Sequence, residues 1–169
     1  MNRARLIWGI AVALGTTSCD LSTKYWAIQS TAHGPRPLIR GLLDLVHAEN
    51  PGMAFSLMHD WPAGVRAVLL TAAPLVTLLI AILAFGRRRL SPAGTLGLAL
   101  VLGGALGNLV DRLRGGTVTD FLYVHRGAFS WPVFNVADIA VSCGAVLLLF
   151  VGRDWERSRV ALGVSRRSS

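Results

Sequence analysis

The sequence predicts an all-α membrane protein with four transmembrane helices, plus a small β-containing subdomain and a short interfacial helix on the extracytoplasmic side. The first observation is composition: 53% of the 169 residues are hydrophobic, 15% are charged, and the mean hydropathy is +0.52, which is too apolar for an ordinary soluble domain. The second is that the apolar residues gather into four stretches, and a membrane-spanning helix needs about 20 such residues. The third is that arginines flank alternate ends of these stretches, as a fixed membrane topology requires.

The four apolar stretches are the predicted membrane spans, and they cover residues 6–28, 65–85, 93–110 and 136–151. The last two are short, so we expect them to cross with little tilt. A cleaved secretory signal would be followed by a hydrophilic chain, whereas here the apolar segments continue to residue 151. The third stretch also carries several glycines, which predict close contact with neighbouring helices.

Charge predicts the orientation of these spans, because short cytoplasmic flanks carry an excess of Lys and Arg. The arginines that flank the spans are Arg3, Arg5, Arg87, Arg88, Arg89, Arg153, Arg157, Arg159, Arg166 and Arg167. Both termini are therefore expected in the cytoplasm, and two segments, about residues 29–64 and 111–135, are expected to face outward. The chain is interpreted as one multi-pass membrane domain over residues 1–153 and a basic cytoplasmic tail over residues 154–169.

The net charge of +8 raises the alternative of a nucleic-acid partner. These arginines lie beside membrane spans and lack interleaved aromatic residues, so we expect no nucleic acid and instead expect contact with membrane lipids that carry anionic headgroups. The two cysteines, Cys19 and Cys143, fall inside predicted spans, away from the compartment where disulfides form. Packing is their expected role.

The two outward segments predict the small β-containing subdomain. Within the first, "LIRGLLDLVHAEN" predicts one or two strands, and "PGMAFSLMHDWP" predicts a turn that leads into the short interfacial helix. Trp61 in that helix suits the level of the lipid headgroups. In the second segment, Gly115 and Gly116 are expected to end the third span, after which "TVTDFLYV" has the composition of a strand.

Ionisable side chains near the outer ends of the spans are candidates for function, because charges at membrane depth are costly. Asp20 and Lys24 lie one turn apart on the first span and predict an ion pair, whose plainer role is structural. On the third span, Gly104, Asn108 and Arg112 are spaced four apart and therefore share a face. Arg112 either supports the site by hydrogen bonds or reaches toward lipid headgroups.

Asp120 and Asp138 are the candidate catalytic pair. Asp138 follows Asn135 by three residues, which by itself predicts a capping box at the start of the fourth span. Asp120 by itself is explained as a solvated loop carboxylate, although the apolar residues 121–124 favour a partly buried setting. Both belong at the outer membrane level, and two close carboxyls share one proton, so that one activates water as a general base and the other is a general acid. This arrangement is typical of aspartic peptidases.

Other interpretations of the same residues stay open at this point. The four histidines lie on the predicted outer side without the spacing of zinc ligands, so no metal and no other cofactor is expected. A transporter also places carboxylates in the membrane, though typically near its middle. The N-terminal segment up to Cys19 also has the pattern of a lipoprotein signal, but Thr16 stands where such signals prefer Leu, and three further spans follow.

Four blocks of the sequence resemble the lipoprotein signal peptidase family, also called signal peptidase II, whose members are four-span aspartic peptidases of the bacterial inner membrane. The blocks are "DLSTK" at residues 20–24, "NPGMAF" at 50–55, "GGALGNLVDRLRGGTVTDF" at 103–121 and "FNVAD" at 134–138. They occur in the family's order and at suitable intervals, and the resemblance covers about residues 5–153.

The resemblance implies that the catalytic dyad is Asp120 and Asp138. It further implies supporting or substrate-binding roles for Asn108, Arg112, Asn135, Asn50, Gly52, Asp20 and Lys24. Because a helix N-terminus stabilises negative charge, we expect Asp138 to be the ionised member of the dyad and Asp120 the protonated one.

The resemblance also implies the reaction, which is removal of the signal peptide from a prolipoprotein just before a cysteine that carries a diacylglyceryl group. The partners would be such prolipoproteins and membrane lipids, the enzyme would be a monomer, and cyclic peptide antibiotics of the globomycin type would inhibit it. No cofactor is implied. The site would lie on the extracytoplasmic side of the bacterial cytoplasmic (inner) membrane, where it can reach the end of a membrane-buried signal helix.

Overall fold

The computed structural model describes residues 3–51 and 90–161, with isolated residues between these ranges, and it describes side chains up to Val151. In chain order the helices and strands are α1 (Arg3–Ser30), β1 (Arg36–Ile39), β2 (Leu43–Asn50), α3 (Pro92–Gly115), β3 (Val118–Arg126), β4 (Phe129–Ser130) and α4 (Val136–Ala161). The second predicted span, apart from isolated residues, and the predicted interfacial helix lie outside the described residues.

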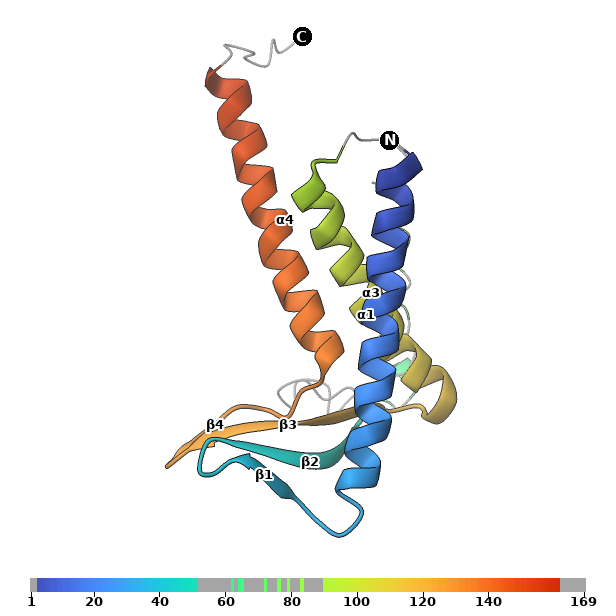
Figure 1. Cartoon of the computed structure of the whole chain (residues 1–169), viewed down its shortest axis with the longest axis vertical. Helices are drawn as coiled ribbons and strands as arrows, with labels where there is room; N and C mark the ends of the chain where they lie inside the picture. The colour runs from blue at the N-terminus through green and yellow to red at the C-terminus, as the bar shows by residue number, and fades with distance from the viewer. Residues whose placement is uncertain are drawn as a thin grey trace.

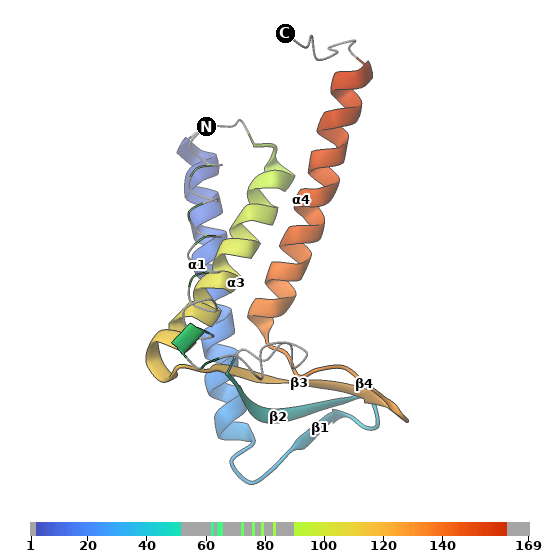
Figure 2. The same cartoon turned by 180° about the vertical axis from the view of Figure 1, so that it is seen from behind.

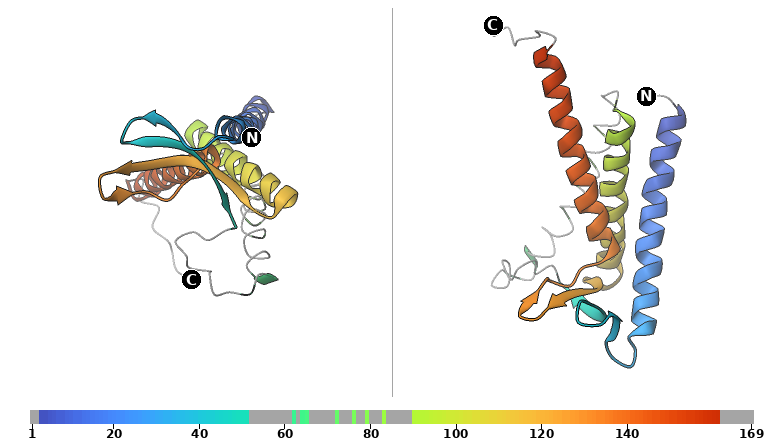
Figure 3. Two further views of the ribbon diagram at one scale, coloured as in Figure 1. Left: turned by 90° about the horizontal axis from the view of Figure 1, so that it is seen from below. Right: turned by 60° about the vertical axis from the view of Figure 1, so that its left-hand side comes forward.

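The three helices lie side by side, and the sheet lies across one of their ends (Figure 1). The helix α3 contacts both α1 and α4 and lies between them in the view from behind (Figure 2). The start of α1 and the end of α4 both lie away from the sheet, and a further view agrees (Figure 3). The described parts of the two segments that the sequence predicts to face outward therefore share one end of the molecule.

Two of the described helices, α1 and α3, are long and apolar enough to cross a membrane. The apolar part of α4 is shorter, Val136–Val151, and the helix continues to Ala161, into the segment predicted as the tail. Large apolar side chains on the outer helix faces are exposed, among them Ile7 on α1 and Leu149 on α4, which suits contact with lipid tails. The described fold is therefore mostly helical with a small sheet, and the count of four spans stays a prediction.

The sheet is antiparallel and has the order β1-β2-β3-β4. Its first hairpin turns at Gly41 and its last at Gly127, and the positive φ angles there, 71° and 59°, are accessible to glycine without strain. The strands predicted in "LIRGLLDLVHAEN" and "TVTDFLYV" are confirmed as β1, β2 and β3, whereas the short β4 was not predicted. An isolated bridge between Leu122 and Phe134 then leads the chain into α4.

Glycines bring the helices into the close contact that the sequence predicts. A Cβ atom on Gly144 of α4 would lie 2.5 Å from the carbonyl oxygen of Gly97 on α3. One on Gly103 of α3 would lie 2.6 Å from the carbonyl oxygen of Ala13 on α1. Side chains larger than hydrogen would push these helices apart, since packed interiors leave no spare room. α3 ends, as predicted, at the glycine pair, with Gly116 as its C-cap.

A small apolar core joins the sheet to the helices. Ala27 of α1, Leu45 of β2 and Phe121 of β3 are buried and pack together, with Val136 at the start of α4 beside them. The sheet is thereby fixed to the ends of two helices. The two cysteines do not fit the packing role expected of them, because both are exposed, and that expectation is wrong.

Candidate active site

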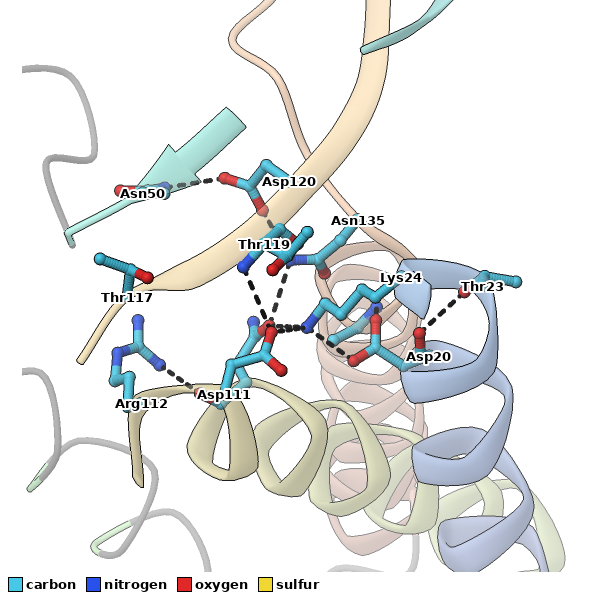
Figure 4. Close-up of polar contacts among 12 residues, drawn as sticks. Asp20, Thr23, Lys24, Asn50, Asp111, Arg112, Thr117, Thr119, Asp120 and Asn135 are labelled. Carbon is cyan, nitrogen blue, oxygen red and sulfur yellow. Dashed lines mark hydrogen bonds and ion pairs between the residues drawn. The ribbon is translucent and has the colours of Figure 1, made fainter. Parts of the chain in front are cut away.

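Asp120 and Asp138 come together where the sheet meets the helix ends. Asp120 lies on β3, and Asp138 lies in the first turn of α4. Asn135 Nδ2 donates to Asp120 Oδ1 at 2.6 Å (Figure 4), and Asn135 Oδ1 accepts from the backbone N–H of Asp138 at 2.9 Å. Because Asn135 is 0% exposed, one buried amide contacts both residues of the candidate dyad.

The capping box predicted at the start of α4 is present. Asn135 Oδ1 caps the Asp138 N–H, and Asp138 Oδ2 in turn accepts the backbone N–H of Asn135 at 3.3 Å. Asp138 therefore lies in the positive field of the helix N-terminus. The cap and a catalytic role are compatible, since a carboxylate has more acceptor sites than the cap occupies.

The helix α3 holds Asp138 through Asn108. Asn108 Nδ2 donates to Asp138 Oδ1 at 2.9 Å. Asn108 Oδ1 accepts from Asn135 Nδ2 at 3.1 Å and from Lys24 Nζ at 2.9 Å. One turn earlier, a Cβ atom on Gly104 would lie 2.5 Å from a backbone carbonyl oxygen of α4. The predicted shared face of α3 is confirmed at these two positions, and it is the face that meets α4.

Arg112 lies one turn further along α3. Its Nη1 donates to the backbone carbonyl of Asn108 at 3.2 Å, and its charge interacts electrostatically with Asp138, Asp120 and Asp111. The described hydrogen bond of Arg112 is thus to its own helix, while its influence on the dyad is that of a nearby positive charge.

A buried charge network lies beside the dyad. Lys24 Nζ is 2.7 Å from Asp20 Oδ2 and 2.8 Å from Asp111 Oδ2, in addition to its hydrogen bond to Asn108 (Figure 4). Asp20 is 0% and Lys24 is 3% exposed, so each charge needs its partners. Asp20 Oδ1 also accepts the Ala137 N–H at 2.8 Å, which attaches α1 to the first turn of α4. The predicted ion pair is confirmed, and it belongs to a larger network.

Asp111 was not among the predicted site residues. Its Oδ2 accepts the backbone N–H of Thr119 at 3.2 Å, so it connects Lys24 to the strand that carries Asp120. A signal was present in the sequence, because Asp111 follows Asn108 by three residues and therefore shares its helix face. An acidic side chain at the end of a membrane span is itself a reason to look for a partner.

The strand β2 holds the other side of Asp120. Asn50, the last residue of β2, donates from Nδ2 to Asp120 Oδ2 at 2.9 Å. Both carboxyl oxygens of Asp120 therefore accept from amide side chains, those of Asn50 and Asn135. Gly52 lies outside the described residues, so its expected role stays a prediction.

Burial raises the pKa of the Asp120 carboxyl to about 6. The hydrogen bond from Asn50 opposes this rise, the negative charge of Asp138 adds to it, and the Asn135 hydrogen bond and the Lys24 charge oppose it. Asp120 is 3% exposed, whereas Asp138 is partly exposed. This asymmetry favours Asp120 as the member that holds a shared proton.

Within the described residues, no three His, Cys, Asp or Glu side chains are grouped so that they could hold a metal ion. Two histidines of the sheet contact carboxylates: His47 Nε2 is 2.9 Å from Glu49, and His125 Nε2 is 3.0 Å from Asp44. The His125–Asp44 pair lies apart from the network of Asp120. Glu49 also accepts from the hydroxyl of Thr119 at 3.3 Å, so the His47–Glu49 pair lies at the edge of this network without contacting the dyad.

The arrangement of the dyad suits acid–base chemistry. Neighbouring carboxyls can share a single proton, as in other pairs of aspartates. Here Asn135 contacts the Asp120 carboxyl through its side chain and the Asp138 carboxyl through its backbone N–H. Such a pair can take a proton from a water molecule with its ionised member and give one to a leaving amine with its protonated member. The surrounding amides of Asn50, Asn108 and Asn135 fix the direction of both carboxyls.

Comparison with known sequences identifies relatives over most of the chain. The family described as signal peptidase (SPase) II matches residues 12–152. A lipoprotein signal peptidase of Syntrophus aciditrophicus is 38% identical over 132 residues, which cover 77% of this chain and 82% of the relative. A lipoprotein signal peptidase of Desulforapulum autotrophicum is 37% identical over 154 residues, which cover 89% of this chain and 94% of the relative.

Two solved structures have a similar fold. Both are bacterial membrane enzymes, and one has a TM-score of 0.74 at 21% identity, covering 95% of this chain and 93% of its own. The other has a TM-score of 0.71 at 23% identity, covering 84% of this chain and 90% of its own. The mostly helical arrangement with a small sheet at one end is therefore a known membrane-enzyme fold.

Proposed function

Because the chain belongs to the signal peptidase II family of aspartic-type membrane peptidases, we propose that it removes signal peptides from prolipoproteins, cutting just before a cysteine that carries a diacylglyceryl group. One observation carries the catalytic part of the proposal: a single buried amide, that of Asn135, contacts Asp120 and the first turn that bears Asp138. The proposed dyad is Asp120 and Asp138, which differ in exposure and in their electrostatic surroundings.

The reaction begins with a water molecule between the two carboxyls. Ionised Asp138 takes a proton from this water as the oxygen attacks the scissile carbonyl, and a tetrahedral intermediate forms. Protonated Asp120 then gives its proton to the departing amine nitrogen as the C–N bond breaks. The proton now on Asp138 passes to Asp120, which resets the pair. No metal or organic cofactor takes part in this scheme.

The remaining polar residues position the dyad. Asn108 and Asn135 orient Asp138, and Asn50 and Asn135 orient Asp120. Lys24 keeps Asn108 in place, and Arg112 places a positive charge near both carboxyls. Fixed dipoles of this kind stabilise charge as it develops, without reorganising during the reaction.

The proposed setting is the bacterial cytoplasmic membrane, crossed four times, with both termini in the cytoplasm and the dyad at the extracytoplasmic surface. In this setting residues 1–153 form the peptidase and residues 154–169 a basic cytoplasmic extension. A membrane-buried signal helix would end at the level of the dyad, while the diacylglyceryl group stays among the lipids. We further propose that the enzyme is a monomer. Cyclic peptide antibiotics of the globomycin type are expected to inhibit it.

The direct test is to incubate the purified protein, in lipid, with a prolipoprotein in two forms, one diacylglyceryl-modified and one unmodified. We expect the modified form alone to be cleaved, with the lipidated cysteine as the new first residue by mass spectrometry. Equal cleavage of both forms would remove the lipid requirement. Absence of cleavage, in protein shown to be folded, would reject the peptidase proposal and reopen the transporter interpretation.

The pKa of Asp120 predicts the pH dependence of the free enzyme. If Asp120 is the proton donor, kcat/KM should fall as pH rises through about 6, because the carboxyl then loses the proton that it must donate. Asn50→Ala removes a hydrogen bond that favours the charged form, so this descending limb should move to higher pH. The measurement is kcat/KM against pH for both proteins.

The matched control for this pH profile is His47→Ala on the same strand, because His47 contacts Glu49 rather than the dyad. Its descending limb should coincide with that of the wild type. A limb that disappears with His47→Ala, or that moves to lower pH with Asn50→Ala, contradicts the assignment of the proton to Asp120.

A further inference from the structure

An exposed surface of apolar and basic side chains lies at the free end of the sheet. Figures 1 and 2 show the sheet continuing past the lower end of α4, so that its two hairpins project beyond the helices. We use the name tip surface for Arg36, Ile39, Leu43, Val124, Arg126 and Phe129. Leu43 and Val124 are half-buried, and the other four are exposed. None of these residues takes part in the dyad or in its network.

The strand register places the tip surface on one face of the sheet. The paired residues are Ile39 with Leu43, Leu43 with Val124, Arg126 with Phe129, and Arg36 with Leu45. Directly paired residues of antiparallel strands point to the same side, and so do residues two apart on one strand. The six side chains therefore form one continuous face across β1, β2, β3 and β4.

We call the part of the sheet nearest the helices its root. At the root, the face that carries the tip surface points toward the helices. There Leu45 is paired with Leu122. Asp120, two residues before Leu122 on β3, accepts from the side chain of Asn135, which directly precedes α4. Outward along β2 and β3, alternate positions keep the same direction. The side of the sheet that the helices cover at the root is open at the tip, where Phe129 is 57% exposed.

The ends of the helices mark the level of the membrane surface. Tyr25 and Trp26 are exposed near the end of α1, and Tyr and Trp at such positions are typical of the membrane–water interface. The next residue, Ala27, packs against Leu45, so the root of the sheet lies at this level. Trp131, which follows β4, is also exposed. The helices cross the membrane from this level, so a face of the sheet that points toward the helices also points toward the lipid headgroups.

The charge of the tip suits anionic headgroups. Arg36 and Arg126 on the tip surface are exposed, as is Arg40 in the turn between β1 and β2. The side chain of Asp44 points to the opposite face of the sheet, where its Oδ2 is 3.0 Å from His125 Nε2, so it adds no negative charge to the tip surface. Arginines beside apolar side chains are the pattern that binds membranes with anionic lipids, and the guanidinium group matches phosphate geometry.

We propose that the tip surface is a binding site for anionic phospholipids of the membrane that surrounds the enzyme. Ile39, Val124 and Phe129 enter the boundary between headgroups and acyl chains, while Arg36 and Arg126 bind lipid phosphates. Because β3 continues from this tip to Asp120, lipid binding fixes the height of the dyad above the membrane. The inference does not depend on the cleavage chemistry, and its test uses no substrate.

The test compares neighbouring residues on opposite faces of β4. Phe129→Cys and Ser130→Cys are made separately in full-length protein in which Cys19 and Cys143 are replaced by Ser, and each carries a nitroxide label. In nanodiscs that contain phosphatidylcholine and phosphatidylglycerol, the label at 129 should collide more with oxygen than with a water-soluble nickel complex. The label at 130, which pairs with His125 on the other face, should show the reverse. Equal access to the nickel complex at both positions overturns the proposal.

The anionic specificity is tested with the same label at residue 129. Replacing phosphatidylglycerol by phosphatidylcholine, or introducing Arg126→Gln, should move this label toward water. Arg114→Gln, which removes an exposed arginine at the end of α3, is the matched control and should leave the label in place. If the depth of the label is the same in both lipid mixtures and is unchanged by Arg126→Gln, anionic lipid binding is contradicted.

Discussion

Asp120→Asn and Asp138→Asn should each lower the rate of signal-peptide cleavage by about 10²–10⁴-fold, the range that a positioned acid or base contributes. In the proposed mechanism, the protonated carboxyl of Asp120 gives a proton to the leaving amine, and the ionised carboxyl of Asp138 takes one from water. An amide of the same shape does neither. Because the two carboxyls act as a unit, the double variant should lose little more activity than either single variant.

The surroundings of the dyad make a stability measurement necessary. Asp120 accepts from the amides of Asn50 and Asn135, and Asp138 accepts from the Asn108 amide and a backbone N–H. An Asn at either position places an N–H donor against another donor, which costs about 1–3 kcal/mol if it stays unpaired. Thermal unfolding and binding of the lipidated precursor should therefore be measured beside the rate.

The matched control for the dyad is Asp44→Asn, which changes an aspartate of the same sheet that contacts His125 instead of the network. Its cleavage rate should stay close to that of the wild type. If Asp120→Asn or Asp138→Asn is folded and cleaves at the wild-type rate, that residue is no part of the catalytic pair, and Asp138 is then only a helix cap.

Lys24→Met should be the most destabilising single change in the described part of the chain. It removes the partner of Asp20 and Asp111 and one contact of Asn108, while Asp20 stays fully buried. Breaking a buried ion pair by removing one partner costs about 3–5 kcal/mol. We expect a large fall in the melting temperature of the protein in lipid, together with loss of cleavage because Asn108 is no longer fixed.

Two further variants separate the ion pair from the general effect of changing α1. Adding Asp20→Asn to Lys24→Met removes the uncompensated charge and should recover part of the melting temperature. Tyr25→Ala changes the neighbouring residue, whose side chain is exposed, and should alter the melting temperature far less. A melting temperature that Lys24→Met leaves unchanged would show that the network contributes little to stability.

Much of the fold was predictable because its signals are local. The helices follow from apolar stretches of spanning length, and the end of α3 follows from the glycine pair. The strands β1, β2 and β3 were expected from composition. The capping box and the Asp20–Lys24 pair were expected from spacings of three and four residues.

The missed features are those that depend on distant segments. The role of Asp111 depends on contacts with Lys24 and the Thr119 N–H, which the sequence spacing does not show. The short β4 exists because it pairs with β3. The exposure of both cysteines depends on which face of each helix its neighbours cover, and one helix by itself does not define that face.

The sequence by itself determined the membrane character of the protein, its helices, most of its strands and the two aspartates that form the candidate dyad. Only the tertiary structure decided that Asn135 connects those aspartates, that Asp111 joins them through Lys24, and that one face of the sheet stays open at its tip. The physical reason is the separation along the chain of the residues that interact. Helix and strand patterns repeat within a few residues, whereas hydrogen bonds between α1, α3, β3 and α4 exist only after the chain has packed.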